Sequence, residues 1–152
     1  MDANDRLKQF RETGRQWCFH LSKTELKRAH DEEADRIRVS LSSGAVKLNE
    51  SIGQPFKVDF SGDTLSLLHV PTTRVIAQAK IDLSETGKLS MMCEGSGWSY
   101  QLHKSSDGTF LWFNWDRHYN ISQLSQLWLE NLVKVAEGRL WGELGVSREK
   151  DP

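Results

Sequence analysis

The chain lacks the features of secreted and membrane-spanning proteins. It has only two cysteines in 152 residues, Cys18 and Cys93, and without a secretory signal two reduced thiols are favoured over a disulfide. The N-terminus is polar and does not show the basic-then-apolar order of a signal peptide. The longest apolar run is Phe110–Phe113, far short of the about 20 residues that a membrane span requires. We therefore expect a cytoplasmic protein that does not bind membranes.

An excess of basic charge is also missing. Lys and Arg number 20 and Asp and Glu number 21, which gives a net charge of -1. A nucleic-acid-binding protein needs a positive surface to displace counterions from phosphates, and this is usually visible as a basic excess or stripe. The composition therefore predicts a protein without a nucleic-acid partner.

Motifs of catalysis and cofactor binding are absent as well. The sequence has no G-x-S-x-G, and the acidic neighbour Glu94 is expected to raise the pKa of the Cys93 thiol, which opposes a nucleophilic role. The Gly95-Ser-Gly97 segment leads into a predicted strand, whereas a phosphate-binding loop opens a helix. We therefore assign no catalytic residue and no cofactor, and an enzyme is the less favoured class.

The histidines form no recognisable metal motif. His30 and Glu33 make one H-x-x-E pair in an acidic helical stretch, which is typical of a solvated face. His69, His103 and His118 lie on or beside predicted strands, and nothing in their spacing indicates a shared site. We therefore predict no metal ligands.

The chain does contain enough apolar material for a core. Apolar residues make up 38% of it and include six Trp and six Phe. A domain of about 150 residues buries roughly 70% of its unfolded surface, so no disulfide or metal is needed for stability. This predicts one α+β domain over residues 1–152, with a polar leader over 1–15 and a loose tail over 146–152.

A capping box marks the start of the first strongly predicted helix. In Ser22-Lys-Thr-Glu25 the Ser hydroxyl and the Glu carboxylate can each satisfy a backbone N–H group. The helix extends from 23 to about 36. Residues 37–52 fit two structures, because alternating polar residues of low helix propensity favour a hairpin, whereas a continued apolar stripe with a stop at Gly53 favours a helix. We favour a helix that continues to residue 52 and keep the hairpin as the alternative.

From Phe56 onward the pattern is that of strands joined by short turns. Each junction carries Gly, Pro, Asp or Ser, which supply the backbone angles of tight turns. Links this short cannot hold crossover helices, so we expect an antiparallel meander over residues 56–116. The six predicted strands are Phe56–Phe60, Thr64–Val70, Arg74–Asp82, Lys88–Cys93, Trp98–Lys104 and Thr109–Asp116.

A second capping box precedes a long C-terminal helix. Asn120-Ile-Ser-Gln123 provides the box, and apolar residues recur at i, i+4, i+8 and i+11 from Leu124. Gly138 is expected to end the regular helix, and Arg139-Leu-Trp-Gly142 is expected to add a last turn. We therefore predict a C-terminal helix over 121–138 that packs on the sheet.

The last predicted strand is apolar on both faces, although a sheet covered by helices on one face should alternate apolar and polar residues. Phe110 and Trp112 share one face, and Leu111, Phe113 and Trp115 share the other. Burial on both sides is the commonest explanation, and an exposed patch that binds a partner is the alternative. Three further aromatic residues near turns or a terminus are expected to be more exposed: Trp98, Tyr100 and Trp141.

Three functional hypotheses follow. The first is a non-enzymatic protein-interaction domain of chaperone, adaptor or inhibitor type, whose partner is another protein or a second copy of itself. The second, suggested by a fold-level similarity to helix-grip domains, is a small apolar-ligand binder with a cavity between the sheet and the C-terminal helix. The third is a small enzyme using Asp116 and His118. The candidate binding residues are Trp98, Tyr100, Trp112, Trp115, His118, Trp128 and Trp141.

Overall fold

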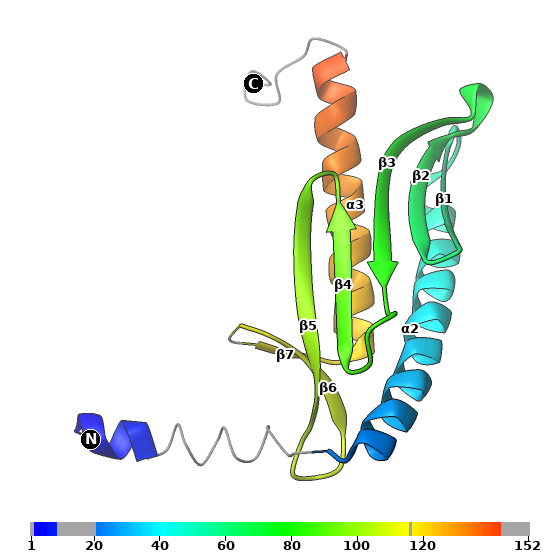
Figure 1. Ribbon diagram of the computed structural model, residues 1–152. Helices are drawn as coiled ribbons and strands as arrows, with labels where there is room; N and C mark the ends of the chain where they lie inside the picture. The colour runs from blue at the N-terminus through cyan, green and yellow to red at the C-terminus, as the bar shows by residue number, and fades with distance from the viewer. Residues whose placement is uncertain (1, 9–20, 116, 144–152) are drawn as a thin grey trace.

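The computed structural model describes residues 2–8, 21–115 and 117–143 (Figure 1). Cys18, most of the predicted leader and the predicted tail lie outside these ranges. Residues 3–8 are helical. The other elements are α2 (Lys23–Ile52), β1 (Phe56–Ser61), β2 (Thr64–His69), the 3-10 helix η1 (Val70–Thr72), β3 (Arg74–Asp82), β4 (Lys88–Cys93), β5 (Ser96–Lys104), β6 (Phe110–Asn114), β7 (Arg117–Tyr119) and α3 (Ile121–Glu143).

The seven strands form one antiparallel sheet in chain order, from β1 to β7. The predicted α+β class and the meander are confirmed. The strand predicted to run to Asp116 ends at Asn114, because Trp115 adopts a positive φ of 54° and the chain turns back into β7. This short seventh strand was not predicted. Asp116 itself lies outside the described residues.

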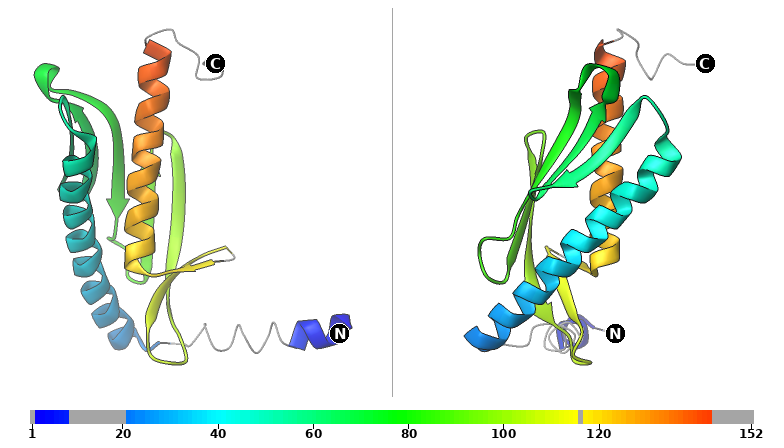
Figure 2. Two further views of the ribbon diagram at one scale, coloured as in Figure 1. Left: turned by 180° about the vertical axis from the view of Figure 1, so that it is seen from behind. Right: turned by 90° about the vertical axis from the view of Figure 1, so that its right-hand side faces the viewer.

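Both long helices pack on the same face of the sheet, so the fold has two layers (Figure 2). α2 lies against the β1 edge and α3 against the middle of the sheet. The opposite face of the sheet is covered by neither helix. This arrangement divides the strand residues into an inner set that faces the helices and an outer set that does not.

Helix α2 is continuous from Lys23 to Ile52, so the long-helix prediction is confirmed and the hairpin is wrong. The Ser22 hydroxyl accepts a hydrogen bond from the N–H of Glu25, as the capping box predicts. Ile37, Leu41 and Ala45 are buried along one stripe of the second half of the helix. Packing of this stripe outweighs the low helix propensity of the intervening residues, as is usual for helices in proteins.

Helix α3 continues to Glu143, so the predicted end at Gly138 is wrong. The reciprocal capping box at its start is confirmed, since the side chains of Asn120 and Gln123 each accept from the other's backbone N–H. Beyond Gly138, Arg139 donates to the carbonyl of Ile76 and pairs with Glu94 at the β4–β5 turn. These contacts hold the last turns of α3 against the sheet.

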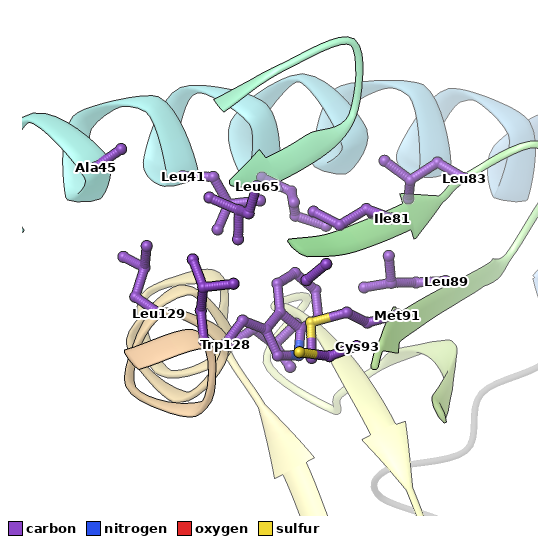
Figure 3. Close-up of a cluster of buried hydrophobic side chains, with 14 of the residues drawn as sticks. Leu41, Ala45, Leu65, Ile81, Leu83, Leu89, Met91, Cys93, Trp128 and Leu129 are labelled. Atoms are coloured by element: carbon purple, nitrogen blue, oxygen red, sulfur yellow. The ribbon is translucent and has the colours of Figure 1, made fainter. Parts of the chain in front are cut away.

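The core lies between the two helices and the inner face of the sheet (Figure 3). Leu41 and Ala45 of α2, Trp128 and Leu129 of α3 and residues of β2 to β4 form one buried cluster. Trp112 and Trp128 are its largest fully buried side chains.

Candidate functional site

The outer face of the sheet carries an aromatic and histidine cluster where β5, β6 and β7 meet. Side chains alternate along a strand, so His103 of β5, Phe113 of β6 and His118 of β7 all project from this face. Phe113 is opposite His118 in the β6–β7 pair. His103 is opposite Leu111 in the β5–β6 pair, one outward-facing position from Phe113. We call His103, Phe113 and His118 the outer-face cluster.

The three rings of the outer-face cluster are in contact. His103 stacks on Phe113 with a centroid separation of 4.8 Å and an interplanar angle of 19°, and His118 lies 4.7 Å from Phe113. Nδ1 of His103 is 3.3 Å from Nε2 of His118. Burial lowers the pKa of both histidines, and the neighbouring His118 lowers the pKa of His103 further. Both imidazoles are therefore favoured in the neutral form.

Trp115 lies at the tip of the β6–β7 hairpin beside this cluster. It is 92% exposed, the most exposed large hydrophobic residue in the described part of the chain. Asn114 pairs with Arg117, so two residues separate these paired positions along the chain, and Trp115 is the first of them. Loops of this length favour Asn, Asp or Gly, which tolerate positive φ. The predicted place of Trp115 on a strand face is therefore wrong, since the loop turns its side chain into solvent.

The surface between Trp115 and Phe113 is hollowed. This hollow has a volume of about 400 Å³, and strands β4, β5 and β6 supply most of its lining. Trp115 and Phe113 provide its aromatic side, and Gln101 is one of its polar residues. At its rim the ammonium group of Lys88 lies 3.1 Å from the carboxylate of Glu85. The hollow thus presents aromatic surface beside a polar, charge-balanced rim.

Most of the other predicted aromatic residues belong to the core. Trp112 and Trp128 are fully buried. Tyr100, which was expected to be exposed, is also buried, because its even position on β5 faces the helices and its hydroxyl accepts from Nε1 of Trp128 at 3.2 Å. Trp98 and Trp141 are half-buried. Of the predicted set, His118 belongs to the outer-face cluster, and Trp115 is exposed beside it.

The predicted solvated pair His30 and Glu33 is instead buried under the sheet. Nδ1 of His30 accepts from the N–H of Gly87 at 3.0 Å, so Nε2 carries the proton and donates to the carbonyl of Leu83 at 2.8 Å. Both ring nitrogens thereby fix the β3–β4 connection to α2.

Burial raises the pKa of Glu33, and the nearby Arg36 opposes the rise. The Trp112 indole N–H also opposes it, although among the described residues that N–H has no acceptor within hydrogen-bond geometry. Glu33 and Trp112 therefore lie in the core, on the opposite side of the sheet from the outer-face cluster.

A groove of about 970 Å³ runs between α2 and α3 on the side away from the sheet. Leu129 and Val133 of α3 and Val39 of α2 line it, and Ser125 donates to Ser40 at 2.8 Å across it. The predicted helix-grip cavity would lie elsewhere, between α3 and the sheet. There Trp112, Trp128 and Leu132 are fully buried in the core cluster.

Within the described part of the chain, the side chains give little support for a catalytic site or for a metal site of three or more ligands. No group of three or more His, Cys, Asp and Glu side chains in residues 2–8, 21–115 and 117–143 is arranged to hold a metal ion. Burial and the charge of Glu94 raise the pKa of the Cys93 thiol. No helix within these ranges is both long and apolar enough to cross a membrane.

Comparisons with protein-family models, with curated proteins and with solved structures find no match to this chain. Function therefore has to be inferred from its own residues.

Sequence reasoning did not single out His103. The length of the loop after β5 could have placed His103. This loop, residues 105–109, puts Lys104 opposite Phe110 and therefore His103 opposite Leu111. A two-residue loop after Asn114 then places His118 opposite Phe113. The registers of the β5–β6 and β6–β7 pairs therefore bring the two histidines to one face. The second register follows from the sequence only once the turn between β6 and β7 is recognised.

Proposed function

We propose that this protein is a non-enzymatic interaction domain that binds another protein through Trp115 and the hollow beside it. The observation that carries the proposal is the 92% exposure of Trp115 at a backbone position with φ of 54°. Left-handed conformations cost non-glycine residues about 1–2 kcal/mol. Exposure of a Trp side chain leaves a large apolar surface in water. Neither feature stabilises the free domain, so a role in binding explains both.

The surroundings of Trp115 suit a contact with protein. Trp is among the residues most enriched at the energetic centres of interfaces, where polar neighbours exclude water around it. Phe113 and Trp115 provide apolar surface in the hollow, and Lys88 and Glu85 at the rim neutralise one another. We infer a partner that inserts an apolar side chain between Phe113 and Trp115 and covers the polar rim.

The outer face leaves room for such a partner. α2 and α3 both lie on the inner face, and Met92 of β4 is also exposed on the outer face. These two observations support a contact on the sheet surface. Of the other two hypotheses, the cavity is not favoured, because its proposed lining is packed into the core. The enzyme depended on Asp116, which lies outside the described residues.

Affinity capture from lysate with matched variants tests the proposal. The bait is the full chain, compared with Trp115→Asn and with Met92→Ala as a control elsewhere on the outer face. We expect a protein captured by the wild type and by Met92→Ala to be lost with Trp115→Asn, and to bind the wild type directly after purification. Equal capture by all three baits would contradict the proposal.

Light scattering of the purified chain tests whether the partner is a second copy of the chain. A monomer is expected for the wild type and for Trp115→Asn. A dimer that Trp115→Asn dissociates would show instead that the partner of this surface is a second copy of the chain.

A further inference from the structure

The outer-face cluster brings two imidazole nitrogens together across a strand. His103 is on β5 and His118 is on β7, and β6 lies between these strands. Nδ1 of His103 nevertheless approaches Nε2 of His118 to 3.3 Å, with an angle of 51° between the rings. The two rings therefore meet above β6 on the outer face.

The separation of these nitrogens is that of two ligands of one tetrahedral metal ion. Zinc binds imidazole nitrogen at about 2.0 to 2.1 Å, so two nitrogens on a tetrahedral zinc ion lie about 3.3 to 3.4 Å apart. Nδ1 of His103 and Nε2 of His118 are 3.3 Å apart in the structure, which is also within hydrogen-bond distance. In that geometry each lone pair points about 35° away from the line between the nitrogens. The second side-chain torsion of histidine has a broad energy profile, so this turn costs little.

The cluster also keeps the two imidazole rings beside one another. Phe113 is stacked on His103 and lies 4.7 Å from His118, so one side chain supports both ligands. All three residues are on paired strands of one sheet, and sites built on such elements are held more accurately than sites on loops.

We propose that His103 and His118 form a two-histidine binding site for a transition-metal dication with tetrahedral coordination, of which Zn²⁺ is the best-fitting example. Imidazole nitrogen suits zinc, copper and nickel, whereas calcium and magnesium require oxygen ligands. The described residues supply no third His, Cys, Asp or Glu ligand. Water can occupy positions that the two imidazoles leave on the ion. This site does not depend on the role of Trp115.

Calorimetric titration of the full, untagged chain with ZnCl₂ tests the proposal. We expect one Zn²⁺ per chain for the wild type. His103→Gln and His118→Gln should each weaken binding by at least about 10- to 100-fold, since that is the loss when only a supporting group of a metal site is removed. His69→Gln is the matched control, because His69 is on β2 and its ring bonds to Thr72. It should bind Zn²⁺ as the wild type does.

Two spectroscopic measurements complete the test. Co²⁺ bound in place of Zn²⁺ should give the visible absorption of a tetrahedral ion in the wild type, and the double variant His103→Gln/His118→Gln should lack this absorption. In the wild type, Zn²⁺ should shift the imidazole NMR signals of His103 and His118 and leave those of His30 unchanged. The proposal is overturned if the double variant binds Zn²⁺ as tightly as the wild type, if His69→Gln weakens binding equally, or if the shifted signals belong to other histidines. Because the NMR measurement uses the wild type, it tests the proposal even if a variant fails to fold.

Discussion

The side chain of Asn49 exchanges two hydrogen bonds with the backbone of Val58. Its amide nitrogen donates to the carbonyl of Val58 at 2.8 Å, and its carbonyl accepts from the N–H of Val58 at 2.6 Å. Val58 is on β1, the first strand of the described sheet. Along that edge of the sheet, the backbone groups of β1 have no neighbouring strand. Asn49 therefore takes the place of a neighbouring strand and attaches the last turn of α2 to the sheet edge.

Replacing Asn49 should destabilise the fold. In Asn49→Ala both backbone groups of Val58, a residue that is 1% exposed, lose their partner. An unsatisfied buried polar group costs about 1–3 kcal/mol, so we expect a loss of that order in the free energy of unfolding. Urea denaturation measures it, with Glu50→Ala, at the exposed neighbouring position, as the control. A loss no larger than that of the control would show that water replaces Asn49 at the edge.

Substitution of two glycines by alanine tests where the two long helices end. Gly138 has no positive φ and no neighbouring atom within 4 Å of an added Cβ, so Gly138→Ala should stabilise α3 by about 0.5–1 kcal/mol. Gly53 ends α2 with φ of 67°, so Gly53→Ala should destabilise the protein. Thermal unfolding of both variants checks this. A loss of stability in Gly138→Ala would mean that α3 ends where the sequence predicted.

Stability should fall as the outer-face histidines become protonated. Their pKa values are lowered from 6.5 in the folded protein, so the folded state binds fewer protons than the unfolded state in the window below 6.5. Unfolding free energy is therefore highest above pH 6.5 and decreases as the pH falls through the lowered values.

The double variant His103→Gln/His118→Gln isolates this effect. Glu33 acts in the opposite sense, because its pKa is raised from 4.5 and its contribution is lost as the pH rises above that value. Since Glu33 is present in both proteins, the difference between their stability profiles reports the histidines. Urea denaturation at several pH values should give a steeper acid loss in the wild type. Parallel profiles would contradict the assigned pKa shifts.

Trp115→Asn should stabilise the free domain while removing the proposed binding residue. Asn tolerates the left-handed conformation that Trp115 adopts at φ of 54°, so the substitution should relieve part of the about 1–2 kcal/mol cost of that conformation. Thermal unfolding should show a higher midpoint for the variant. A clear decrease would mean that Trp115 stabilises the fold through contacts of its own, and the argument from strain would fail.

The elements of this fold were largely predictable because their signals are local. Capping boxes at Ser22 and Asn120 mark both helix starts, and turn residues between the strands predict the meander. The predicted helix end at Gly138 was wrong because the chain does not take a positive φ there. Arg139 instead holds the next turn of α3 to the sheet.

The site was less predictable because it depends on one unusual residue. The loop residue Trp115 has no turn propensity, so the predicted strand was extended past Asn114 and β7 was missed. With β7 missed, the register that brings His118 to His103 could not be counted. Tyr100 was misplaced for a related reason, since its exposure follows from which sheet face the helices cover.

The dissociation constant of the captured partner for wild type, Trp115→Asn and Met92→Ala tests the central claim most directly. Loss of a Trp at an interface centre costs at least about 2 kcal/mol, which is about a 30-fold change in affinity at 25 °C. We predict a weakening of that size or more for Trp115→Asn, with Met92→Ala unchanged and both variants folded. An affinity unchanged in Trp115→Asn, or an equal loss in Met92→Ala, would contradict a binding surface centred on Trp115.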